Sequence, residues 1–101
     1  MFIYNITFKV DHAILEEWIN WQKEEHIPEI MATRFFNDYK FFRLLDQDES
    51  EGPTYIVQYF TDAKENYDQY IHQFAPMLRE KAIIKWGDKI ISFRSLLQSV
   101  Q

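Results

Sequence analysis

The sequence has no cysteine, which excludes disulfide bonds, thiol catalysis and cysteine zinc sites. It has only two glycines and three prolines, so we expect long elements, short loops and no glycine-rich phosphate-binding loop. No apolar run approaches the roughly 18 residues of a membrane-spanning helix. The first residues lack the pattern of a signal peptide, and we therefore expect a cytoplasmic protein.

Basic side chains are also scarce, because 11 Lys and Arg face 16 Asp and Glu and give a net charge of −5. This balance argues against nucleic acid and anionic membranes as partners, since both require a basic surface. Aromatic side chains are abundant instead: nine Phe, six Tyr and three Trp among 101 residues. A chain of this length and composition predicts a single domain over residues 1–101 with a large aromatic core.

Hydrophobic periodicity predicts the order of the elements, since a period of two is typical of strands and spacings of three and four are typical of helices. The expected elements are a strand at 2–10, a helix to about His26, a short helix at 28–32, strands at 35–45 and 54–60 joined by an acidic turn, a helix to Trp86 kinked near Ala75, and a strand at 89–97. Asp11 is the expected cap of the first helix. Asp62 and Glu65 approximate a capping box for the later helix, which Gly87 is expected to end.

This β-α-β-β-α-β order predicts an α+β fold of the ferredoxin-like type, with a four-stranded antiparallel sheet and helices on one face. In the later strands, both alternating sets of side chains are apolar, as the neighbours Phe41 and Phe42 illustrate. An antiparallel sheet with one solvated face shows polar residues on that face. We therefore expect a homodimer in which two sheets pack against each other.

The element order, the length and the aromatic sheet resemble the dimeric α/β-barrel superfamily, which includes small monooxygenases, muconolactone-isomerase-like proteins and haem-degrading enzymes. The segment 21–31, WQKEEHIPEIM, is similar to the end of the first helix in several branches. Together with YNITFKV at 4–10 and KWGD at 85–88, it resembles an uncharacterised bacterial family with no assigned activity. The resemblance specifies the fold, and one fold hosts many chemistries.

Polar residues within apolar elements are the candidate site residues. Asn5 interrupts the first strand, and the resemblance implies a role in substrate binding; a buried amide bonded across the sheet is the alternative. His26 is either a base or ligand contact at a cavity or a structural histidine at a helix end. The candidate catalytic residues are Asn5, His26 and Arg43, and the candidate ligand-binding residues are Asn5, Thr7, Trp21, His26, Arg43, Gln58 and Arg94. Ion pairing at the subunit boundary is the alternative for the two arginines.

No metal or cofactor site is predicted. The acidic turn from Asp46 lacks the glycine and glutamate positions of an EF-hand loop, and His26 with Glu29 provides too few metal ligands. The residues around His72 do not reproduce a haem-binding motif. Two hypotheses remain: a non-catalytic homodimer that binds a small molecule between its two sheets, and a cofactor-independent monooxygenase- or isomerase-like enzyme for a small aromatic or acidic substrate.

Overall fold

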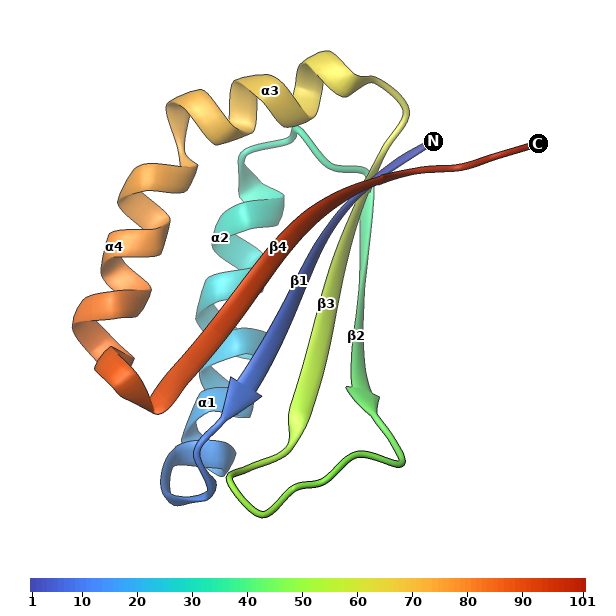
Figure 1. The fold of residues 1–101 in the computed structure, drawn as a ribbon. Helices are drawn as coiled ribbons and strands as arrows, with labels where there is room; N and C mark the ends of the chain where they lie inside the picture. Colours follow the sequence, from blue (N-terminus) through green and yellow to red (C-terminus); the bar gives the residue numbers. More distant parts are fainter.

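Four antiparallel strands form one sheet in the order β2-β3-β1-β4, and the computed structural model describes all residues 1–101 (Figure 1). The strands are β1 (Phe2–Val10), β2 (Asp38–Leu44), β3 (Thr54–Thr61) and β4 (Ile90–Gln98). Strand β1 lies at the centre and pairs with β3 on one side and β4 on the other. The two halves of the chain therefore interleave in one sheet, as the ferredoxin-like fold requires.

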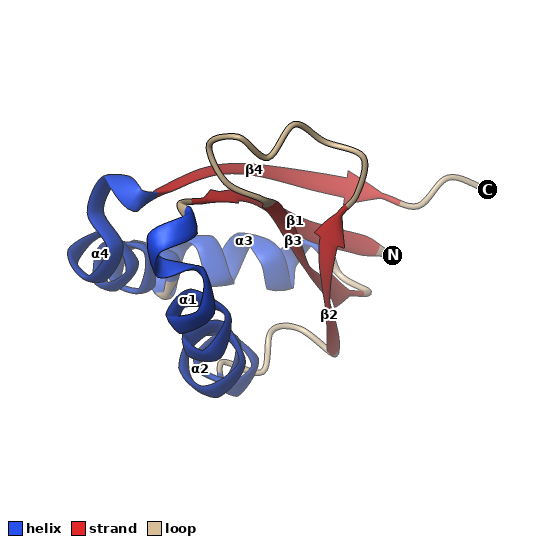
Figure 2. Ribbon diagram, turned by 90° about the horizontal axis from the view of Figure 1, so that it is seen from below, coloured by secondary structure: helices blue, strands red, loops and turns tan.

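The helices all cover one face of this sheet, as Figure 2 shows. They are α1 (Leu15–Trp21), a π-helical segment η2 (Gln22–His26), α2 (Ile27–Ala32), α3 (Lys64–Gln73) and α4 (Ala75–Trp86), with short 3-10 turns at η1 (His12–Ile14) and η3 (Gly87–Lys89). None of them is both long and apolar enough to cross a bilayer. The predicted βαββαβ architecture is confirmed.

Helix ends agree with the sequence pattern at three positions and differ at one. The Asp11 carboxylate accepts a hydrogen bond from the Ala13 N–H at 2.8 Å, which confirms the first cap. Helix α4 begins at Ala75, after a break at Phe74, with Pro76 in its first turn, and Gly87 ends this helix with a φ of +57°. The capping box expected at Asp62 is wrong, because the helix begins one residue later and Asp62 accepts from Asn37 Nδ2 at 3.3 Å instead.

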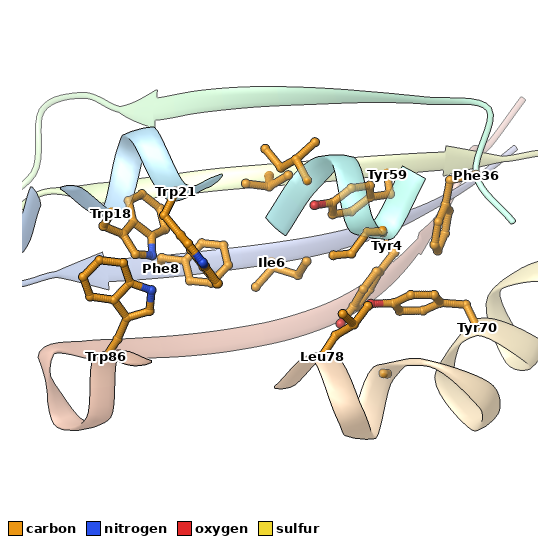
Figure 3. Packing of buried hydrophobic residues seen from close by; sticks show 14 of the residues in the cluster. Tyr4, Ile6, Phe8, Trp18, Trp21, Phe36, Tyr59, Tyr70, Leu78 and Trp86 are labelled. Atoms are coloured by element: carbon orange, nitrogen blue, oxygen red, sulfur yellow. The ribbon is translucent and has the colours of Figure 1, made fainter. Parts of the chain in front are cut away.

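The core lies between the helices and one face of the sheet. In β1 the even-numbered residues from Tyr4 to Val10 are all buried, and the register places Tyr4 beside Tyr59 and Ile6 beside Val57. Figure 3 shows two aromatic groups along this face, with Ile6 between them. One group gathers Phe8, Trp18, Trp21 and Trp86, and the other gathers Tyr4, Phe36, Tyr59 and Tyr70.

The opposite side of the sheet, which we call the open face, carries no helix. Its side chains come from the other set of alternating residues: Ile3, Asn5, Thr7, Lys9, Phe42, Leu44, Ile56, Gln58, Phe60, Ile91, Phe93 and Leu97. Phe93 is 69% exposed and Phe42 is 44% exposed, although both are large apolar groups. The expectation that the sheet is apolar on both faces but sheltered on only one is confirmed.

Candidate functional site

A cavity of about 80 Å³ lies inside the protomer, between the helices and the β1–β4 part of the sheet. Its floor is formed by Tyr4, Ile6 and Phe8 of β1, so it spans the gap between the two aromatic groups of Figure 3. Helix α4 and the segment η2 supply the remaining walls. Most of its lining is apolar, and a few polar groups converge on it, which is the usual composition of a small-molecule site.

The π-helical segment η2 supplies two of those polar groups, Gln22 and His26. Here the Ile27 N–H donates to the Gln22 carbonyl, five residues earlier, in place of the α-helical spacing of four. Such segments are rare and occur frequently at functional sites. Pro28 follows in the first turn of α2, where a missing N–H is tolerated. The helix therefore continues past His26, while its widened turn faces the cavity.

Three side chains of the cavity have buried polar atoms that no protein group satisfies. These atoms are Nε2 and Oε1 of Gln22, Nε of Arg79 and the indole Nε1 of Trp86. Gln22 is only 1% exposed. Buried polar atoms are nearly always hydrogen-bonded in folded proteins, so a group of unpaired ones around a single cavity makes it the candidate binding site.

His26 is packed against an aromatic wall and is neutral. Its ring stacks on Trp21 with centroids 4.4 Å apart, and Trp21 in turn meets Trp86 edge-on at 5.7 Å. Burial lowers the pKa of His26 to about 4; Glu29 opposes this shift, whereas Lys81 and Arg94 add to it. A neutral imidazole has one nitrogen that can accept a proton or a hydrogen bond.

The charged residues of the cavity are all basic. Arg79 and Arg94 line it, and none of its 18 lining residues is Asp or Glu. Neither arginine belongs to any of the ion pairs in the structure, which use Lys9, Arg43, Lys64, Lys81 and Lys89 as their cations. Arg79 Nη2 donates to the Tyr4 hydroxyl at 3.1 Å, and this bond holds the guanidinium over β1. The cavity is therefore positive within a chain of net charge −5.

A family model described as "Domain of unknown function (DUF4286)" matches residues 1–100. The chain belongs to the DUF4286 family. The resemblance to an uncharacterised family of ferredoxin-like proteins is thereby confirmed. No curated protein matches this DUF4286 sequence.

Solved structures share the fold of this DUF4286 chain at low sequence identity. A dimeric ferredoxin-like protein from an uncultured marine organism is 11% identical, with a TM-score of 0.75 over 99% of this chain and 95% of that one. An EthD family protein from Bacillus halodurans is 16% identical, with a TM-score of 0.68 over 99% and 100%. A variant of SnoaB, a cofactor-independent oxygenase from Streptomyces nogalater, is 14% identical, with a TM-score of 0.67 over 99% and 93%.

The candidate residues of the DUF4286 sequence divide between the two faces of the sheet. Trp21, His26 and Arg94 line the cavity. Asn5, Thr7 and Gln58 lie on the open face, where Gln58 Nε2 donates to Asn5 Oδ1 at 3.1 Å and Asn5 Nδ2 donates to Thr7 Oγ1 at 3.5 Å.

Arg43 is separate from both groups, because its guanidinium is paired with Glu49 in the β2–β3 connection. Within one protomer, Asn5, His26 and Arg43 therefore do not share a cavity. Asn5 alternates in β1 with Tyr4 and Ile6, whose side chains point toward the helices, so its own side chain points away from His26.

The sequence reasoning missed Gln22, Arg79 and Trp86 as site residues. A signal was present, because Gln22 lies four residues after Trp18 and four before His26 on the buried stripe of the helix. Arg79 and Trp86 are seven residues apart and share one side of α4. No group of three metal-ligating side chains exists in the structure.

Proposed function

We propose that this protein binds a small organic anion in the cavity between its helices and its sheet. The observation that carries the proposal is the pair Arg79 and Arg94, which line the cavity without any acidic partner. A carboxylate provides the geometry that a guanidinium recognises best, because two N–H groups can donate in parallel. The unpaired donors Arg79 Nε and Trp86 Nε1 add two further positions for acceptor atoms.

The low pKa of His26 connects this residue to the proposed anion site. Its pKa of about 4 reflects burial and the nearby cations Lys81 and Arg94. A bound anion would offset both cations and raise the pKa of His26, because an opposite charge within a few ångströms favours the protonated form. Ligand binding and proton uptake by His26 are therefore expected to be linked.

Isothermal titration calorimetry with benzoate tests the anion site. We expect Arg79→Gln and Arg94→Gln each to weaken benzoate binding by about tenfold or more, since hydrogen bonds to charged groups are the strong ones. Arg43→Gln is the matched control, because Arg43 is exposed and lies outside the cavity. Equal affinities for benzoate in the wild type and both cavity variants would reject the proposal.

We propose further that the protein is a homodimer whose two open faces pack against each other. The exposed fractions of Phe93, Ile91 and Phe42 support this arrangement, since a monomer would leave these apolar groups in water. The dimeric ferredoxin-like protein from the uncultured marine organism, which has a similar fold, also supports a dimer. The cavity lies within each protomer, so the ligand proposed here occupies the helix side of the sheet, whereas the prediction from the sequence placed it between the two sheets. Sedimentation equilibrium is expected to give twice the 12.4 kDa of one chain.

A second candidate function is cofactor-independent proton transfer at carbon, as an isomerase would require. The imidazole of His26 in the cavity supports it, because a bound 3-oxo acid anion would raise the pKa of His26 and let it take a proton from an acidic C–H bond of that ligand. The C–H electron pair would become the enolate double bond, and Arg94 would stabilise the oxyanion. The test is deuterium exchange into acetoacetate in D₂O, followed by NMR. Exchange at the same rate in the wild type and in His26→Gln would exclude this function.

A further inference from the structure

We infer that the ligand is a planar acid whose buried end carries a hydrogen-bond donor and an acceptor side by side, as at the edge of a lactam ring. This inference rests on the proposed anion-binding function and names the chemistry of the ligand at the end away from its carboxylate. The observation behind it is Gln22, a residue that is 1% exposed and lines the cavity with both amide atoms unpaired.

The amide of Gln22 restricts what can be placed against it. Its Nε2 donates and its Oε1 accepts, and the two atoms lie in one plane. A hydrocarbon would leave both atoms unpaired, and a carboxylate, which only accepts, would leave Oε1 facing a negative charge. A ring with adjacent N–H and C=O groups satisfies both atoms through two parallel hydrogen bonds.

The cavity around Gln22 fits one end of a flat ring. Trp21 and Trp86 meet edge-on at 5.7 Å, and His26 extends this aromatic wall by stacking on Trp21. The volume of about 80 Å³ is roughly half of the 150 Å³ that accommodates benzene in an engineered cavity. Only the end of a ring is therefore enclosed, and we place the acidic end toward Arg94, which is an exposed residue of the lining.

The test compares three related acids by isothermal titration calorimetry. The first probe, 6-hydroxynicotinate, exists as the lactam and carries its carboxylate on the opposite side of the ring. Nicotinate lacks the lactam, and the N-methyl derivative of 6-hydroxynicotinate keeps the carbonyl and loses the donor. We expect wild-type protein to bind the lactam about tenfold more tightly than either comparison acid, because each comparison acid loses at least one of the two hydrogen bonds to Gln22.

Variants of glutamine provide the matched controls. Gln22→Met retains a side chain of similar size without polar atoms, and we expect it to bind all three acids with equal affinity. Gln73→Met removes the amide of an exposed glutamine on α3 and should keep the tenfold preference. Circular dichroism of each variant verifies the fold, and the comparison of the N-methyl acid with its parent needs no variant at all.

The outcomes separate this inference from the function on which it rests. If none of the acids binds the wild-type protein, the anion site itself is wrong. If nicotinate binds with a dependence on Arg79 and Arg94 and the lactam gains nothing, the anion site stands and the role of Gln22 is overturned. The same conclusion follows if the preference for the lactam survives in Gln22→Met.

Discussion

The replacement Gln22→Met should make the ligand-free protein more stable, although it changes a buried residue. Both amide atoms of Gln22 are shielded from water and lack a protein partner. An unsatisfied buried polar group costs about 1–3 kcal/mol on the scale of protein variants. Methionine fills nearly the same space without that penalty, so we expect the free energy of unfolding to rise by about 1–2 kcal/mol.

Guanidinium chloride unfolding, followed by circular dichroism at a fixed protein concentration, measures this difference. A fixed concentration is needed because association with a second copy would add to the apparent stability. In a thermal scan, the same gain corresponds to roughly 4–8 °C per kcal/mol for a domain of this size. Gln73→Met is the control, and its exposed position should keep the change within about 0.5 kcal/mol. A loss of more than about 1 kcal/mol in Gln22→Met would show that the Gln22 amide is already bonded, which would refute the reasoning.

Three further predictions concern pH, association and the hairpin. Between about pH 6.5 and 4 the unfolded chain binds a proton at His26 that the folded protein does not, because folding lowers the pKa of His26 to about 4. The free energy of unfolding should therefore fall as the pH decreases through this window. The same pH profile of unfolding in the wild type and in His26→Gln would argue against this role of His26. Phe93→Glu should shift sedimentation toward the monomer, whereas Ile84→Glu, which charges an exposed apolar residue on α4, should not. Equal effects of the two substitutions would contradict the open-face dimer. Arg43→Gln should leave the unfolding midpoint unchanged, since exposed ion pairs such as the one with Glu49 contribute little, and a marked loss would assign this pair a structural role.

The positions of the strands could be predicted because alternation is a local property of the sequence. Which of the two alternating sets of side chains faces the helices could not be predicted for every strand. In β1 the alternation of Tyr4 and Asn5 separates buried from open residues. In β2 the neighbours Phe41 and Phe42 are both apolar, so the pattern alone assigns neither of them to the core. The pairing of Phe41 with Val57, and of Val57 with Ile6, settles the question through long-range register.

The site was predictable in part for the same reason. Trp21 and His26 lie on the apolar stripe of the first helix, and both face the cavity. The π turn that holds Gln22 was missed because periodicity does not distinguish it from an α-helical turn, and its hydrogen bond is seen only in the backbone. Asn5 was grouped with His26 because both interrupt apolar elements, yet the sheet lies between them.

The central claim is that the helix-side cavity binds a small acid, and the indole N–H of Trp86 reports on it most directly. This group lines the cavity and has no partner in the protein. In a two-dimensional ¹H–¹⁵N NMR titration with benzoate, we predict a saturable shift of the Trp86 indole signal in the wild type and a much weaker response in Arg94→Gln. A Trp86 signal that does not move at millimolar benzoate would contradict the account.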